Sequence, residues 1–394
     1  MKILRIGLDN SILDKNSSLA QRAIEYGKLV KKYTIIIPIN NFELKITNLN
    51  LSDRVSVDGV KTSNKIFTLY KIYKLAKQKL KLDKYDVITI QDTYYLALIG
   101  FIFSRKFKIG LELQIHGFEK YSGLRKIIAK FVIPRANAIR CVSQRLRKRL
   151  VSAFGVEEKK ITVVPIYINT NSYKYKTNSH EYALDGLKQN KESKLIFLTV
   201  GRLVPVKNIE MQIRAFKNLV PTIPLAYREH DSHVVNLRTT NNKNIELWIV
   251  GDGPEREKLE LLIKDLGLEN KVKLLGWQKD VNKFLLQADI FLLTSNYEGW
   301  GLVVIEASSF GLPIIMTDVG CAGEVIKNNE SGLIIDVGNQ EALENSMIKL
   351  IENKELRKKL GENARQALKK LPNKEETFKL YESSLKQAME NYNK

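Results

Sequence analysis

The chain has 394 residues, of which 44% are apolar and 27% are charged, and this composition excludes a disordered chain or a fibrous rod. At roughly 100–200 residues per domain, the length predicts two domains or three. Two distant cysteines, Cys141 and Cys321, exclude a disulfide framework and a structural zinc cluster and fit a reducing compartment.

The net charge of +21 is confined to the first half of the chain. Residues 1–180 hold 34 basic and 13 acidic side chains, whereas residues 181–394 hold 30 of each. Such an asymmetry is typical of a surface that meets an anionic partner, which can be nucleic acid, anionic lipid or an acidic substrate. The alternative is a lysine-rich background composition without a specific partner.

Short apolar runs alternate with helical patterns through the first half of the chain. The runs that predict strands lie at residues 2–7, 34–39, 86–90, 109–115, 136–142 and 161–164. Helical periodicity falls at residues 18–32, 66–80, 124–133 and 144–154. The longest apolar run, Tyr94 to Phe103, is too short for a bilayer, which needs about 20 residues. Buried strands separated by helices indicate a parallel sheet covered on both faces.

A polar stretch at residues 167–193 is interpreted as a linker to a second series of the same kind. Its strands are predicted at residues 195–200, 245–250, 272–275, 290–294, 313–317 and 332–335. Its helices are predicted at residues 209–220, 255–266, 281–287, 302–310, 322–326, 341–351, 354–371 and 374–391. Within it, the polar stretch 221–244 holds His230 and His233, where metal binding is the alternative to a solvated loop.

The two series predict an α/β chain of two doubly wound parallel-sheet domains that face each other across an inter-domain cleft. We place the first domain at residues 1–175 and the second at residues 190–375. A C-terminal helix at about 376–394 is expected to pack back on the first domain.

Three loops that follow strands in the second series hold residues suited to binding a ligand. Residues 201–208 place Arg202 and Lys207 where they suit a diphosphate, and the alternative is a solvated basic loop. Residues 251–254 hold two glycines that let a ligand approach, but Arg256 stands where a dinucleotide fingerprint needs glycine. The alternative for these glycines is a tight turn.

The strongest stretch is residues 296–307, where glycines flank the start of a helix. The amides from Gly301 to Val303 form an expected anion site at the helix N-terminus. Glu298 and Glu306 bracket this site, and carboxylates accept hydrogen bonds from sugar and ribose hydroxyls. The alternative is a surface glutamate and a helix-dipole glutamate.

On these residues the sequence resembles the retaining glycosyltransferases of family 4, whose two facing Rossmann-like domains form the GT-B fold. The Glu298…Glu306 pair matches the family's E-x7-E motif, and residues 201–207, 251–254, 275–277 and 298–332 also match. The first half matches more loosely, at residues 91–92, 114–117 and 140–143. The loop after the first strand, residues 8–11, lacks the Gly-Gly that family members often carry.

The resemblance implies roles for individual residues. Arg202 and Lys207 would bind the donor's diphosphate, Glu298 the transferred sugar and Glu306 the ribose. The implied donor-binding set is Arg202, Lys207, Gly251, Gly276, Gly299, Trp300, Gly301, Leu302, Val303 and Glu306. His116 and Glu298 are the implied catalytic residues, and Asp9, Asn10 and Asp92 are placed on the acceptor side.

The expected reaction is transfer of a sugar from a UDP- or GDP-linked donor, with retention of anomeric configuration. The cations at Arg202 and Lys207 would stabilise the leaving diphosphate, so we expect neither a metal nor another cofactor. A front-face route, in which the leaving phosphate takes the acceptor proton, needs no protein nucleophile.

The acceptor is expected on the basic first domain, as a glycan or a lipid-linked sugar. Lysines alternate with aromatic and aliphatic residues from Lys61 to Lys84, which is typical of a helix that lies on an anionic membrane. An ordinary exposed helix is the alternative. We therefore expect a cytoplasmic protein at the inner face of the cell membrane.

Two other function classes remain as alternatives, and the residues disfavour a third, an inactive scaffold. A nucleic-acid-binding protein explains the charge but neither the glycine loops nor the paired glutamates. A nucleotide-sugar epimerase of the same two-domain form would turn over the donor without an acceptor. An inactive scaffold would lack the site residues that are present here.

Overall fold

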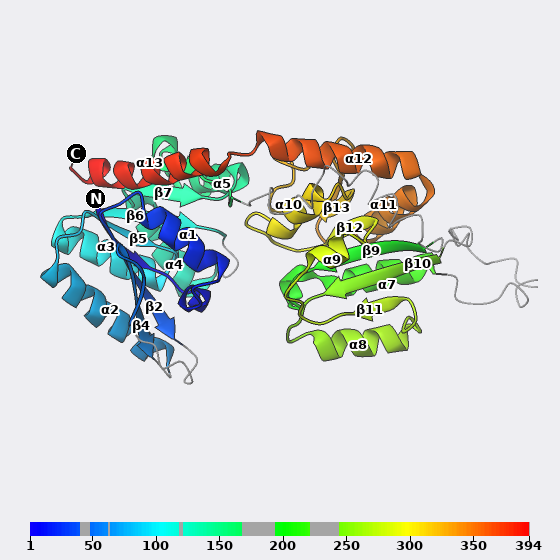
Figure 1. The fold of residues 1–394 in the computed structure, drawn as a ribbon, viewed down its shortest axis with the longest axis horizontal. Coiled ribbons are helices and arrows are strands. Elements are labelled where there is room, and N and C mark those ends of the chain that lie inside the picture. Colours follow the sequence, from blue (N-terminus) through cyan, green and yellow to red (C-terminus); the bar gives the residue numbers. More distant parts are fainter. Residues whose placement is uncertain (40–47, 62–63, 118–120, 168–193, 221–243, 394) are drawn as a thin grey trace, which may run out of the picture. The chain divides into compact units, whose positions relative to one another are not determined.

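The computed structural model describes residues 1–39, 48–61, 64–117, 121–167, 194–220 and 244–393, in two compact units (Figure 1). Unit 1 comprises Met1–Pro165 and Pro372–Lys394, and unit 2 comprises Ile166–Leu371. Except for residue 167, the expected linker lies outside the described residues. The polar stretch 221–244, with its two histidines, also lies outside them except for residue 244.

An eight-stranded sheet forms the centre of unit 1, in the order β3-β4-β2-β1-β5-β6-β7-β8. All neighbouring strands are parallel except β3 and β4. The strands are β1 (Lys2–Ile6), β2 (Lys32–Ile39), β3 (Asn48–Ser52), β4 (Val55–Lys61), β5 (Val87–Ile90), β6 (Gly110–Ile115), β7 (Ala138–Cys141) and β8 (Ile161–Val163).

Helices cover both faces of this sheet because the chain runs from β1 to β2 in one direction along the sheet and from β4 through β8 in the other. The helices are α1 (Ser18–Gly27), α2 (Lys65–Leu82), α3 (Tyr95–Phe107), α4 (Gly123–Val132), α5 (Gln144–Phe154) and α13 (Lys374–Asn393). Short 3-10 turns lie at η1 (Asn10–Leu13), η2 (Ile133–Arg135) and η3 (Glu158–Lys160). The crossovers place α2 to α5 on one face, and α1 and α13 share the other, where Tyr26 and Tyr381 stack with ring centroids 3.8 Å apart.

The C-terminal helix α13 packs on β6 and β7, so the last residues complete the fold of unit 1 (Figure 1). Ser384 donates its hydroxyl to the buried Glu112 carboxylate at 2.6 Å. The guanidinium of Arg140 lies 3.7 Å from the ring centroid of Tyr381. A polar cluster therefore fixes α13 against the sheet from within the core.

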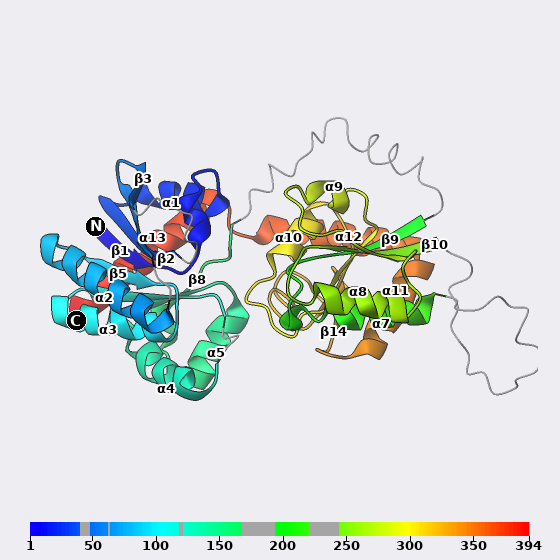
Figure 2. The same cartoon turned by 90° about the horizontal axis from the view of Figure 1, so that it is seen from below.

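Unit 2 is built on a six-stranded sheet, all parallel, in the order β11-β10-β9-β12-β13-β14. The strands are β9 (Lys194–Val200), β10 (Asn244–Val250), β11 (Val272–Leu274), β12 (Ile290–Leu293), β13 (Ile314–Thr317) and β14 (Leu333–Ile335). The helices are α7 (Ile209–Leu219), α8 (Arg256–Asp265), α9 (Asn282–Leu285), α10 (Leu302–Ser309), α11 (Gln340–Glu352) and α12 (Lys354–Ala367), with 3-10 turns η4 (Pro205–Lys207) and η6 (Leu368–Lys370). Figure 2 shows α7, α8 and α11 together beside this sheet, and α7 contacts both of the others.

Two doubly wound parallel-sheet units confirm the predicted fold class. Two local predictions were wrong. Strands β3 and β4 were not predicted, and residues 322–326 form turns with an isolated bridge rather than a helix. Gly320 and Gly323 adopt φ angles of 58° and 79° there, which a right-handed helix does not allow. Among the helices that the structure describes, none is both long and apolar enough to cross a bilayer.

Candidate functional site

The candidate site in unit 2 lies where β9 and β12, neighbours at the centre of the sheet, reach their carboxyl ends. Backbone contacts bring the two following loops together. The amide of Asn296 donates to the carbonyl of Val206 at 2.7 Å. The hydroxyl of Thr294 donates to the carbonyls of Lys207 and Asn208 at 3.1 and 3.0 Å. The loop that carries Lys207 is thereby fixed against the start of the strongest sequence stretch.

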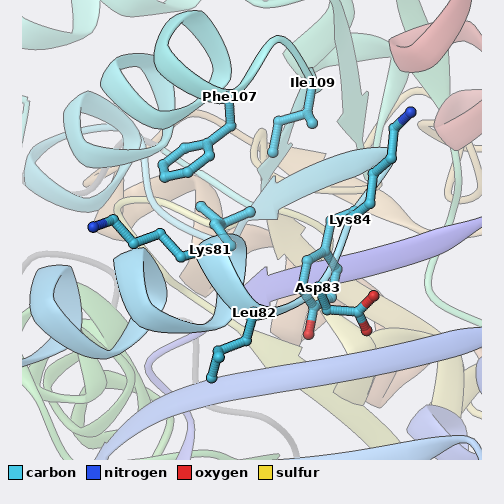
Figure 3. A pocket seen from close by; sticks show the side chains of 8 residues that line it. Lys81, Leu82, Asp83, Lys84, Phe107 and Ile109 are labelled. Carbon is cyan, nitrogen blue, oxygen red and sulfur yellow. The ribbon is translucent and has the colours of Figure 1, made fainter.

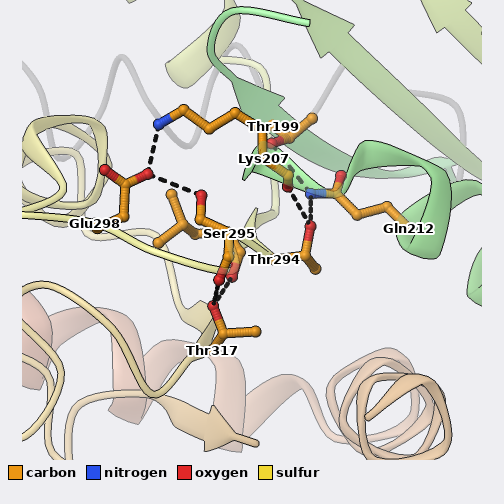
Figure 4. A network of polar contacts seen from close by, with 8 residues as sticks. Thr199, Lys207, Gln212, Thr294, Ser295, Glu298 and Thr317 are labelled. Atoms are coloured by element: carbon orange, nitrogen blue, oxygen red, sulfur yellow. Dashed lines mark hydrogen bonds and ion pairs between the residues drawn. The ribbon is translucent and has the colours of Figure 1, made fainter. Parts of the chain in front are cut away.

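Lys207 and Glu298, which are 91 positions apart in the sequence, form an ion pair at this edge (Figure 4). The lysine ammonium donates to Glu298 Oε1, and the hydroxyl of Ser295 donates to the same oxygen at 2.8 Å. The structure therefore joins two predicted site residues directly, a cation from one loop and a carboxylate from the other.

A buried polar network supports this pair from below (Figure 4). Gln212 on α7 donates to the hydroxyls of Thr294 and Thr199 at 2.7 and 3.3 Å. Thr317, at the end of β13, donates to the carbonyl of Ser295 at 2.7 Å. Three strands and one helix thus hold the loop positions, so the pair sits on rigid elements.

Helix α10 presents its N-terminus to the same region. Gly301 precedes the helix with a φ of 86°, and no side chain of the described residues caps the first turn. An uncapped helix start offers backbone N–H groups to an anion. Trp300 is buried, and its indole nitrogen has no hydrogen-bond partner among the described residues. Glu306 is half-buried at the fifth position of α10.

The glycine loops meet backbone to backbone. The amide of Gly251 donates to the carbonyl of Gly276 at 2.8 Å, and the amide of Gly201 donates to that of Val250 at 2.9 Å. Gly251 has a φ of 139°, and a Cβ there would lie 1.8 Å from the Gly201 carbonyl oxygen. Close packing alone therefore requires glycine at this position, whatever a ligand needs. Arg202, at the same edge, is exposed.

The acceptor-side residues of the prediction lie at the carboxyl edge of the sheet of unit 1. Asp9 accepts from the amide of Ser11 at 3.0 Å, and Asn10 opens η1 with its side-chain oxygen Oδ1 buried. Asp92 follows β5 and accepts from the amide of Leu96 at 2.9 Å, at the start of α3. Burial raises the pKa of Asp92 despite this bond.

His116 comes directly after β6 at the same edge. Desolvation by the surrounding protein, and then the charges of Arg140, Arg5 and Arg22, lower its pKa from the ordinary value of 6.5 to about 4. Part of the side chain also reaches solvent at this edge. The imidazole is accordingly neutral at pH 7.

Sequence reasoning missed the buried charges beneath His116. Arg5 donates to Gln91 at 2.5 Å, and Arg140 Nη2 lies 3.7 Å from Glu112. Both arginines are less than a tenth exposed. A charged residue inside an apolar strand was the signal that could have identified them.

A shallow pocket of about 210 Å³ lies at the opposite, amino-terminal edge of this sheet (Figure 3). It is lined by Leu80, Lys81, Leu82, Asp83, Lys84, Tyr85, Phe107 and Ile109. Asp83 is paired there with Lys2 and Lys32, which lower its pKa to about 2. None of the predicted site residues lines it.

Two family models match the chain, one on each half. The model described as "Glycosyl transferases group 1" matches residues 186–367, and "Glycosyltransferase Family 4" matches residues 42–172. The candidate site of unit 2 lies within the first match, and Asp92 and His116 lie within the second.

Relatives and solved structures agree with these matches. A lipopolysaccharide core biosynthesis glycosyltransferase, LpsE of Rhizobium meliloti, is 28% identical over 44% of this chain and 51% of its own length. An Escherichia coli UDP-Gal:alpha-D-GlcNAc-diphosphoundecaprenol alpha-1,3-galactosyltransferase is 25% identical over 76% of this chain and 73% of its own. The chain thus spans about half the length of LpsE. The crystal structure of Anabaena HepE in complex with UDP shares the fold, with a TM-score of 0.72 and 19% identity. The match covers 98% of this chain and 100% of the HepE chain.

Proposed function

Because this chain belongs to the family of the glycosyl transferases group 1, we propose that it transfers a sugar from a nucleoside diphosphate sugar to a glycan, retaining anomeric configuration. The observation that carries the proposal is the Lys207–Glu298 pair beside the uncapped start of α10. A cation and free amides suit a diphosphate, and a carboxylate suits sugar hydroxyls.

In the proposed reaction, unit 2 binds the donor. Arg202, Lys207 and the amides after Gly301 stabilise the negative charge that develops on the leaving diphosphate, so no metal or other cofactor is needed. Glu298 orients the transferred sugar, and Glu306 holds the ribose. The acceptor hydroxyl gives its proton to the leaving phosphate.

The donor is proposed to be a UDP-sugar, with a GDP-sugar as the alternative. The UDP complex of HepE and the UDP-Gal specificity in the name of the Escherichia coli relative support the first choice. The names of both relatives support a lipid-linked or lipopolysaccharide-type acceptor. The proposal places the protein in the cytoplasm at the inner face of the cell membrane, with His116 of unit 1 as a catalytic residue.

Calorimetry and thermal shift with UDP and GDP test the donor site. A ligand at 100 times its dissociation constant stabilises the protein by about 2.7 kcal/mol. Arg202→Ala and Lys207→Ala should each weaken nucleoside diphosphate binding roughly ten- to two-hundred-fold, because charged hydrogen bonds contribute about 1.5–3 kcal/mol. Lys264→Ala, an exposed lysine on α8, is the matched control. Unchanged affinity in both site variants would contradict the assignment.

A further inference from the structure

Exposed apolar side chains are concentrated on one layer of unit 1. Among the described residues, 13 large apolar side chains are exposed, and nine of them lie on α2, α3 and α4. These nine are Ile66, Phe67, Tyr70, Leu82, Tyr95, Ile102, Leu124, Ile127 and Phe131. The three helices are neighbours, with α3 in contact with both α2 and α4 (Figure 2).

The same three helices carry charge of a single sign. Their sequences hold eleven lysines and arginines and neither aspartate nor glutamate. Lys79 on α2 pairs with Asp58 at 2.7 Å, whereas no described carboxylate forms an ion pair with Lys74, Lys126 or Lys130. A surface that exposes both apolar groups and unpaired cations complements an anionic lipid bilayer. The apolar side chains can enter the acyl region, and the cations can bind the lipid phosphates.

Topology places most of this surface at the edge of the sheet that carries His116. Helices α2, α3 and α4 each begin after the carboxyl end of a strand, namely β4, β5 and β6. Ile66, Phe67 and Tyr70 lie in the first two turns of α2, and Leu124 and Ile127 lie in the first two turns of α4. A membrane at these helix starts would meet the acceptor side of unit 1.

Helix α4 has the most clearly amphipathic arrangement of the three. Leu124, Ile127 and Phe131 are spaced three and four residues apart, which places them along one face, and we call them the α4 stripe. Leu124 and Ile127 are 59% and 66% exposed. Lys126 and Lys130 are exposed beside them.

We propose that α2, α3 and α4 form a membrane-binding surface, in which the α4 stripe enters an anionic bilayer and the surrounding cations bind lipid phosphates. This inference deepens the proposed function by naming the partner of unit 1. High salt screens the cations but leaves the burial of apolar side chains in place. Vesicle binding that persists at high salt therefore distinguishes insertion of the α4 stripe from attraction by charge alone.

Flotation of the full chain with phosphatidylglycerol–phosphatidylcholine vesicles, at low and high salt, tests the proposal. Ile127→Gln should weaken vesicle binding about tenfold, and this loss should persist at high salt. Leu261→Gln, on α8 of unit 2 and 63% exposed, is the matched control and should bind as the wild type does. Lys126→Gln/Lys130→Gln should weaken vesicle binding about 30-fold at low salt, whereas Lys358→Gln/Lys359→Gln, exposed on α12, should bind as the wild type does.

Three outcomes would overturn the proposal. The first is that the wild type does not bind vesicles, which leaves an acidic protein or a second copy as the occupant of the surface. The second is equal binding of the wild type to pure phosphatidylcholine vesicles. The third is that Ile127→Gln and Leu261→Gln change vesicle binding equally. Calorimetry with UDP or GDP in the absence of vesicles should give wild-type affinity for every one of these variants. Failure of the membrane surface is thus separable from failure of the donor site.

Discussion

Glu298→Gln should strengthen nucleoside diphosphate binding while it weakens sugar transfer. In the structure, Glu298 holds the ammonium of Lys207, so a diphosphate must compete with a carboxylate for that cation. The glutamine amide keeps the size of the side chain but removes its charge. Lys207 is then free to bind phosphate, whereas the hydrogen bonds that we assign between Glu298 and the transferred sugar are weakened.

The burial of the pair sets the magnitude. Exposed ion pairs contribute about 0.2–1 kcal/mol, and charged hydrogen bonds about 1.5–3 kcal/mol. The side chains of Lys207 and Glu298 are 20% and 13% exposed, which places the pair between these cases. A release of about 1 kcal/mol corresponds to roughly fivefold tighter binding of UDP or GDP. Loss of the pair should also lower the melting temperature by about 2–4 °C for a unit of this size.

Calorimetry with the nucleoside diphosphate alone, beside a transfer assay with the donor sugar, separates the two effects. Glu210→Gln is the control, because this carboxylate pairs with Arg214 and Lys258 away from the site. That variant should change neither quantity. If Glu298→Gln instead weakens diphosphate binding as much as Lys207→Ala does, the competition between carboxylate and phosphate is refuted.

Glu306→Ala should weaken UDP or GDP binding about tenfold in calorimetry, because the ribose that it is proposed to hold is part of the free diphosphate; wild-type affinity would contradict that role. Transfer activity should survive EDTA, because Arg202 and Lys207 neutralise the diphosphate. If EDTA abolishes the activity and magnesium or manganese restores it, the reaction depends on a metal ion. His116→Gln should flatten the rise of stability between about pH 4 and 6.5, measured by urea unfolding. Unfolded wild-type chain binds more protons than folded chain in that window, because folding lowers the pKa of His116 from 6.5 to about 4, so stability rises with pH there. An identical pH dependence in both proteins would show that the imidazole is not perturbed.

Apolar periodicity was sufficient to predict every described strand of the two sheets except β3 and β4, because strands buried on both faces read as continuous apolar runs. It failed where burial is one-sided. Strand β3 is mostly exposed or half-buried, and its alternation in residues 48–52 is short. Residues 322–326 have a helical composition, but the left-handed Gly320 and Gly323 stop a helix, and a sequence does not reveal which glycines adopt that conformation.

The candidate site was predictable as positions at strand ends but not as a set of contacts. Arg202, Lys207 and Glu298 could be placed at the carboxyl edge of a parallel sheet, because the order of strands and helices determines which loops reach that edge. The pairing of Lys207 with Glu298 depends on which strands are neighbours, and β9 and β12 are far apart in sequence. Exposure of the α4 stripe likewise required knowing that no described element covers that face.

Helix α13 gives this chain an unusual order of assembly during synthesis. Unit 2 is continuous in sequence, whereas unit 1 needs Pro372–Lys394 to cover Glu112 and Arg140. A ribosome that adds about 5–20 residues per second takes roughly 10–45 s to travel from the end of the first segment to the last helix. During that interval the earlier-made sheet keeps one face open, so the half that is synthesised first is the half that finishes folding last.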